Sequence, residues 1–207
     1  MENDKNSLQI QSLQRTIIEI SMSFDATIEG FARAMDLREK EAEGHIYRVS
    51  ETTVLLAKAM SINEADCLHI KRGAYLHDIG KMGIPDAILQ KPGFLTKKER
   101  SLVRMHPQYA YDLLFSIPQL YYALDIPYRH HEKWDGSGYP DGLKGEQIPL
   151  AARIFAIVDV YDALTSARPY RPAWLKERAL NHIREQSGEH FDPNVVEAFF
   201  GIIPNLK

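Results

Sequence analysis

The stretch His77-Asp78-Ile79-Gly80-Lys81 places a histidine beside an aspartate, with a lysine within one helical turn of both. Apolar residues flank the pair, so we expect the two side chains to lie near a core, where charged groups need partners or a metal ion. An ordinary alternative is a solvated helix end that Gly80 stops. Further metal-ligating side chains elsewhere in the chain decide between the two.

Such side chains occur in several other segments. Glu41 lies four residues before His45, and Asp159 lies three residues before Asp162, so each pair can share one helix face. The full candidate set is Glu41, His45, His77, Asp78, His106, His130, His131, Asp159 and Asp162. One metal ion takes about six ligands at most, so this set predicts two or three ions that share carboxylates. Imidazole and carboxylate without thiolate favour Fe or Mn and admit Zn.

The composition is that of a globular protein. The chain has 207 residues, of which 44% are hydrophobic and 26% are charged, enough for one domain with a sizeable core. The net charge of −3 provides no basic surface for duplex nucleic acid. The single cysteine, Cys67, excludes an internal disulfide and is expected in the core. Because no apolar run is long enough to span a membrane and no signal peptide is recognisable, we expect a cytoplasmic protein or cytoplasmic fragment.

Periodicity and helix-start signals predict an all-α fold, with no convincing strand. The expected helices cover 6–36, 42–60, 61 or 63 to 78, a short turn from Pro85, 97–105, then segments from Pro107, from Pro118 to His131, from Pro149, from Pro172 to Ser187 and from Pro193. A capping box at Thr96-Lys97-Lys98-Glu99 starts one of them. The glycine-rich segment 132–148 is not expected to be helical.

The first of these helices has an apolar seam. Ile10, Leu13, Ile17, Ile20 and Phe24 follow alternating spacings of three and four over two heptads. Two interpretations are open: a helix laid along its own domain, which we favour after Phe24, or a coiled-coil stalk that dimerises or transmits a signal. Such a stalk would normally hang below a sensor or receiver domain, which is absent from this chain.

The order of the motifs resembles the HD-GYP family, a branch of the HD-domain metal-dependent phosphohydrolases. The resemblance covers residues 35 to 200 or so and is carried by Glu41…His45, His77-Asp78-x-x-Lys81, His106-Pro107, His130-His131-Glu132, Gly138-Tyr139-Pro140 and Asp159-x-x-Asp162. It implies a helical HD-domain bundle with two or three metal ions that hydrolyses cyclic di-GMP to linear pGpG, in some members onward to GMP. It divides the chain into an N-terminal helical segment, 1–34, and a catalytic domain, 35–207.

The resemblance also implies a role for each matched residue. The implied metal ligands are His45, His77, Asp78, His106, His130, His131 and Asp159, with Glu41 as a ligand of a third ion. Among them, Asp78 is expected to bridge ions, and His77, Asp78 and Lys81 are expected to be catalytic. Lys81, Arg168 and Arg171 match phosphate-binding positions, although solvated charges are the alternative. Asp162 is expected to orient a ligand or an arginine rather than bind metal.

The residues themselves indicate phosphodiester hydrolysis. No serine or cysteine nucleophile is placed among them, so the expected nucleophile is a metal-bridging water or hydroxide attacking in line. Lys81 could hold a phosphate oxygen or assist the leaving group. In the Gly138-Tyr139-Pro140 loop, Tyr139 either stacks on a guanine base or packs the loop onto the bundle. Two other classes stay open: an HD-type hydrolase of nucleoside mono- or triphosphates, and a catalytically silent cyclic di-GMP receptor.

Overall fold

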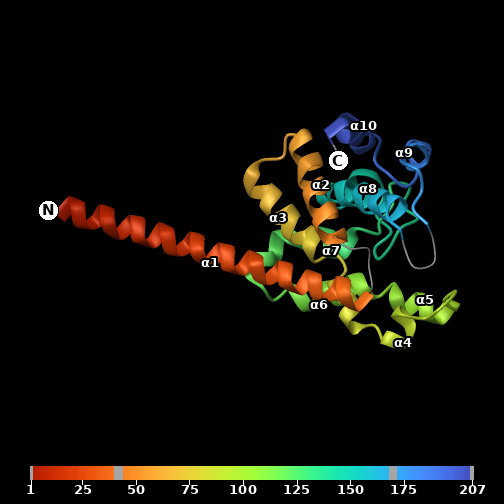
Figure 1. Ribbon diagram of the computed structural model, residues 1–207, viewed down its shortest axis with the longest axis horizontal. Coiled ribbons are helices and arrows are strands. Elements are labelled where there is room, and N and C mark those ends of the chain that lie inside the picture. The colour runs from red at the N-terminus through yellow and green to blue at the C-terminus, as the bar shows by residue number, and fades with distance from the viewer. Residues whose placement is uncertain (1, 40–43, 168–171, 206–207) are drawn as a thin grey trace.

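The computed structural model describes residues 2–39, 44–167 and 172–205 (Figure 1). In those ranges the chain forms α-helices, short 3₁₀ helices and no β-strand, which confirms the all-α fold. The α-helices are α1 Glu2–Glu39, α2 His45–Ala59, α3 Glu64–Tyr75, α4 Asp86–Leu89, α5 Lys97–Val103, α6 His106–Leu114, α7 Asp125–Arg129, α8 Leu150–Thr165, α9 Lys176–Glu185 and α10 Pro193–Ile202. The 3₁₀ helices are η1 Ile79–Gly83, η2 Pro118–Ala123, η3 Gly145–Gln147 and η4 Ile203–Asn205.

Helix α1 extends far beyond the rest of the molecule at its N-terminal end (Figure 1). The seam residues Ile10, Leu13, Ile17 and Ile20 are between 56% and 65% exposed, whereas Ile28 is only 4% exposed. The helix therefore packs on the bundle only through its C-terminal part, and it passes the predicted boundary at residues 34 and 35 without a break. That division into two segments stays a prediction. No described helix has the length and apolarity needed to cross a membrane.

Helix α8 lies in the middle of the bundle. It packs against α2, α7, α9 and α10, and its Ile154, Phe155 and Ile157 are fully buried. Helix α2 also packs against α3, which leads into the His77-Asp78 pair. Each CH₂ group buried in this core stabilises the folded state by about 0.8 kcal/mol, and this packing holds in place the helices that carry the site.

Local sequence signals start several helices where they were predicted. The Asn63 side chain accepts a hydrogen bond from Asp66 N at 2.9 Å and begins α3. The capping box of Thr96 and Glu99 begins α5. Asp192 accepts a hydrogen bond from Asn194 N at 2.8 Å and begins α10. The predicted capping box is thus confirmed, residue 63 rather than 61 precedes the third helix, and the last helix begins at Pro193 as predicted; each of these signals depends only on residues within one turn.

Two predicted helices differ in the structure. The helix expected from Pro118 to His131 is divided into η2 and α7. The helix expected from Pro172 begins only at Lys176, because Trp174 N donates a hydrogen bond to Leu164 O at 2.9 Å and holds the preceding segment extended. That bond joins α8 to the segment before α9, so no local sequence pattern predicts it.

Gly80 does not end a helix, so the alternative of a solvated helix end at this glycine is wrong. Helix α3 already ends at Tyr75, and Gly80 lies inside η1. A Cβ atom at Gly80 would overlap the carbonyl oxygen of His106 and lie 2.5 Å from Ala110 N. The glycine is therefore required by the close approach of η1 to α6, which brings Asp78 near His106.

Candidate metal centre

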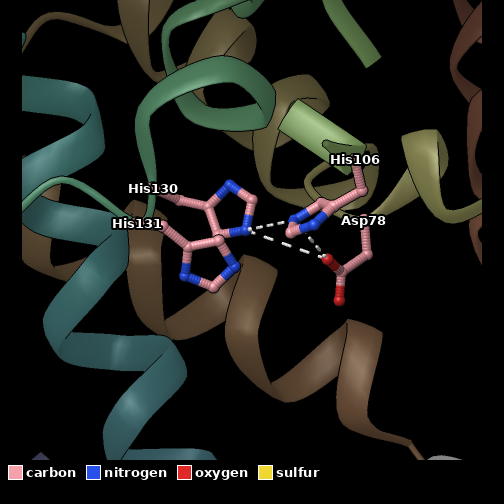
Figure 2. Close-up of side chains that lie close together, drawn as sticks. All are labelled: Asp78, His106, His130 and His131. Atoms are coloured by element: carbon pink, nitrogen blue, oxygen red, sulfur yellow. Dashed lines mark hydrogen bonds and ion pairs between the residues drawn. The ribbon is translucent and has the colours of Figure 1, made fainter. Parts of the chain in front are cut away.

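Five segments bring the predicted ligands together. His77 and Asp78 lie in the turn between α3 and η1, His106 begins α6, and His130 and His131 directly follow α7. Asp78, His106, His130 and His131 each offer a ligand atom within 4.8 Å of the others (Figure 2). His45 at the start of α2, His77 and Asp159 on α8 form a second such group. We call these the Asp78 cluster and the His45 cluster.

Backbone carbonyls orient three of the histidines. Nδ1 lies 2.9 Å from Ala74 O in His77, 2.8 Å from Val103 O in His106 and 2.9 Å from Ile126 O in His130. A carbonyl oxygen only accepts, so each Nδ1 carries a hydrogen, which leaves Nε2 of each ring as the atom that can bind a metal ion. The helix ends thus fix imidazoles in the tautomer that a metal ligand needs.

The atoms that face one another in the Asp78 cluster lack hydrogens between them. Nε2 of His106 lies 3.4 Å from Nε2 of His130 and 3.3 Å from Oδ1 of Asp78. That buried oxygen accepts no hydrogen bond from any described residue. Converging lone pairs and an orphaned carboxylate oxygen repel unless a cation lies among them. The residues therefore fit a divalent metal ion.

Asp78 joins the two clusters. Its Oδ1 faces His106 and His130, whereas its Oδ2 lies 3.0 Å from Nε2 of His77 in the His45 cluster. One carboxylate thus presents an oxygen to each group of ligands, as two adjacent ions require. Glu41, Arg168 and Arg171 lie outside the described residues, so a third ion and the two predicted phosphate-binding arginines receive no structural account.

Burial and neighbouring charge set the protonation of these groups. Burial lowers the pKa of His106 and His130 and lowers that of His131 to about 3, so their imidazoles are neutral. Burial opposes charge on His77, yet the adjacent Asp78 carboxylate outweighs it and raises its pKa to about 9. The proton that His77 holds beside Asp78 is the one that a metal ion would displace.

Asp162 lies behind His45 rather than in either cluster. Its Oδ2 accepts a hydrogen bond from His45 Nδ1 at 2.7 Å, and its Oδ1 accepts one from Arg48 Nε at 2.5 Å. The carboxylate therefore orients the imidazole and leaves Nε2 of His45 directed at the cluster. Arg48 was not singled out in the sequence, although it lies one turn after His45 on α2.

Lys81 is held between two carboxylates. Its Nζ donates to Asp78 Oδ2 at 2.7 Å and to Glu39 Oε2 at 2.6 Å. Burial favours the neutral amine, but Asp78 and Glu39 outweigh it and raise the pKa of Lys81. Glu39 was missed from the sequence. The available signal was its place at the C-terminus of α1, where the helix dipole disfavours a carboxylate unless a cation compensates it.

The last turn of α1 is fastened to the segment that carries Lys81. Arg38 donates through its guanidinium to Lys81 O at 2.8 Å and to Ile84 O at 2.7 Å, and it pairs with Asp86 at 2.7 Å. Together with the Glu39 contact, these bonds attach the long exposed helix directly to the site.

Glu132 closes the glycine-rich loop that follows the two histidines. Its buried carboxylate accepts hydrogen bonds from Asp141 N at 2.7 Å, Gly142 N at 3.0 Å and Leu143 N at 3.1 Å. At Gly138 a Cβ atom would lie 2.6 Å from His131 O, so only glycine permits this backbone approach. The loop is thus packed against the end of the ligand-bearing segment.

Tyr139 lies on the histidine pair. Its ring stacks on His131 with centroids 4.7 Å apart, and the Arg104 guanidinium carbon lies over the same ring at 4.9 Å from its centroid. The peptide bond between Tyr139 and Pro140 is cis. The phenol ring therefore has protein partners of its own, as the packing alternative for Tyr139 predicted. Stacking on guanine stays a prediction.

An α-helical bundle with two adjoining imidazole–carboxylate clusters is the class of domain that holds divalent metal ions. The model of the HD domain family matches residues 29–195. The chain therefore belongs to the HD domain family, which confirms the resemblance inferred from its motifs.

Proteins of known activity are similar over most of this chain. The cyclic di-GMP phosphodiesterase response regulator RpfG of Xanthomonas campestris is 42% identical over 190 residues, covering 91% of this chain and 50% of that protein. The 3'3'-cGAMP-specific phosphodiesterase 2 of Vibrio cholerae is 37% identical over 183 residues, covering 87% of this chain and 35% of that protein. This chain thus spans half or less of the length of these two relatives.

A solved structure shares the fold. The cyclic GMP-AMP specific phosphodiesterase V-cGAP3 of Vibrio cholerae superposes with a TM-score of 0.63 at 21% identity, covering 86% of this chain and 48% of that chain. At that identity the likeness concerns the helical architecture alone.

Proposed function

We propose that this domain is a metal-dependent phosphodiesterase that hydrolyses cyclic di-GMP to pGpG. The observation that carries the proposal is Asp78, whose two oxygens serve both clusters while Lys81 donates to one of them. The names of the relatives support a cyclic dinucleotide as substrate.

The residues divide the work of hydrolysis. Asp78, His106, His130 and His131 would hold one ion, and His45, His77 and Asp159 another, with Fe or Mn preferred and Zn admitted. Bound divalent ions supply Lewis acidity at the phosphate and lower the pKa of water. Lys81, already cationic and fixed by Glu39, can donate a hydrogen bond to a phosphate oxygen or to the departing oxygen. One water is consumed and one P–O bond of the ring is broken.

Three alternatives can be separated in one experiment. The 37% identity to a cGAMP-specific phosphodiesterase favours a related cyclic dinucleotide as a second candidate substrate. A nucleotidase and a catalytically silent receptor are the other classes. Purified protein loaded with Fe(II) or Mn(II) would be incubated with cyclic di-GMP, 3'3'-cGAMP and nucleoside mono- and triphosphates. Release of pGpG from cyclic di-GMP supports the proposal, whereas turnover of nucleoside phosphates alone, or of nothing in metal-loaded protein, contradicts it.

The number of ions is a separate prediction. On its sequence position one turn before His45, Glu41 is expected to contribute to a third ion. We expect Glu41→Ala to lose one ion of three and keep two, as measured by elemental analysis of protein loaded with excess metal. Two ions per chain with Glu41 intact would contradict a three-metal centre.

The exposed seam of α1 leads us to expect a homodimer. The apolar side chains of Ile10, Leu13, Ile17 and Ile20 have no described partner, and a second copy in parallel would bury them. Leu13→Glu combined with Ile17→Glu should give monomers in light scattering, with unchanged helical circular dichroism. The control pair Gln11→Glu and Ser12→Glu lies off the seam and should stay dimeric. Wild-type protein that is monomeric at high concentration would contradict the expectation.

A further inference from the structure

Arg104 is a cation at the rim of the centre that none of the motifs includes. It follows the last turn of α5 and lies two residues before His106, the first residue of α6. Its side chain is exposed, and its guanidinium carbon lies 4.9 Å from the centroid of the Tyr139 ring. Since Tyr139 stacks on His131, Arg104 is separated from the Asp78 cluster by a single ring.

The guanidinium has donors to spare. In the part of the chain that the structure describes, the Arg104 side chain makes no hydrogen bond or ion pair. Its guanidinium makes a cation–π contact with the Tyr139 ring. A cation–π contact of this kind positions a guanidinium and leaves N–H groups free for an acceptor. Arg100, one turn earlier on α5, differs because its guanidinium donates to Leu95 O at 3.5 Å.

A cyclic dinucleotide carries two phosphodiesters, and only one can be attacked at the Asp78 cluster. A second anionic group within the same small ring must then lie near the rim. A guanidinium that lies over an aromatic ring and keeps free donors can match the paired oxygens of such a phosphate bidentately.

We propose that Arg104, held by the Tyr139 ring, binds the phosphodiester of the cyclic dinucleotide that is not being cleaved. This proposal rests on the proposed function and names a residue through which a cyclic dinucleotide is distinguished from a simple diester. The O6 and N7 atoms of guanine offer the same paired acceptors, so the base is the other source of this chemistry.

Arg104→Ala is compared with wild type, with Arg104→Lys and with Arg100→Ala as the matched control. The readouts are KM and kcat for cyclic di-GMP and the Kd of a phosphorothioate analogue of cyclic di-GMP that resists hydrolysis. Losing a charged bidentate hydrogen bond should raise KM and Kd by about 10- to 100-fold. Arg104→Lys should recover part of this loss, and Arg100→Ala should match wild type.

Two further measurements separate the possible causes. Metal content should be unchanged in Arg104→Ala, and hydrolysis of bis-p-nitrophenyl phosphate, which has one phosphodiester, should fall much less than that of cyclic di-GMP. Analogue binding should weaken equally for cyclic di-GMP and cyclic di-AMP, because both contain the second phosphate. Weakening confined to cyclic di-GMP would overturn the proposal in favour of base recognition.

Two results separate this proposal from the proposed function. Unchanged KM and Kd in Arg104→Ala, in protein whose wild type cleaves cyclic di-GMP, would overturn the role of Arg104 alone. Failure of the metal-loaded wild type to cleave any cyclic dinucleotide would instead overturn the proposed function.

Discussion

Replacing Asp78 by alanine should reduce cyclic di-GMP hydrolysis by at least about 1000-fold while the helical fold is retained, because several kcal/mol of transition-state stabilisation depend on the ions it holds. The side chain serves both ligand clusters through separate oxygens and also pairs with Lys81. His77→Ala should have a similar effect. The measurement is single-turnover product release, with metal content and circular dichroism determined on the same samples.

A matched control separates the loss of this carboxylate from the loss of any carboxylate. Asp112 on α6 is exposed and accepts a hydrogen bond only from Gln108, at 2.7 Å, among the described contacts. Asp112→Ala should leave hydrolysis and metal content at the wild-type level. Substantial turnover by Asp78→Ala, with metal content unchanged, would contradict the assignment of Asp78 as the shared ligand.

Among the glycines, Gly80 is where an added methyl group should be most damaging. The added Cβ would overlap the carbonyl oxygen of His106, and backbone atoms cannot rotate away as a flexible side chain would. Overpacking of this kind costs about 3 kcal/mol of unfolding free energy, which lowers Tm by roughly 6–12 °C in a chain of this size. Relief of the clash would separate η1 from α6, so metal content should also fall.

Gly30 on α1 provides the control for the same substitution. A Cβ atom there would meet nothing within 4 Å, and alanine is a better helix former than glycine by up to about 1 kcal/mol. Gly30→Ala should therefore raise Tm slightly and leave metal content unchanged. Equal Tm values for Gly80→Ala and wild type would show that η1 and α6 are not in the contact described.

Interactions between residues within one helical turn were predictable from the sequence, whereas contacts between distant segments were not. The Thr96–Glu99 capping box and the Asn63 cap depend on neighbours three residues away, so the sequence contains the whole interaction. The sequence also singled out, by their order along the chain, imidazoles and carboxylates that the structure groups into two clusters, and their binding of metal stays a prediction. The structural need for Gly80 could not be predicted, because it lies in the contact with His106 on α6, about 26 residues later in the chain.

Side chains that contact the predicted ligands and site residues could not be identified from the sequence for a similar reason. Glu39 reaches Lys81 across 42 residues, and Arg104 reaches the loop residue Tyr139 from the end of α5. Charged residues are common on helix surfaces, and nothing local distinguishes one that faces a site. Glu132 was part of a quoted motif, but its role in closing the loop appears only when its three backbone donors are placed around it.

The positions of bound metal ions test most directly whether Asp78 is shared by two clusters. Anomalous diffraction from crystals loaded with Fe or Mn should give one peak among Asp78, His106, His130 and His131, and a second among His45, His77 and Asp159, with Asp78 between them. In Asp78→Ala crystals, both peaks should be weaker than in wild type, because both ions would lose a shared ligand. Fully loaded wild-type crystals with no anomalous peak beside Asp78 would contradict the account.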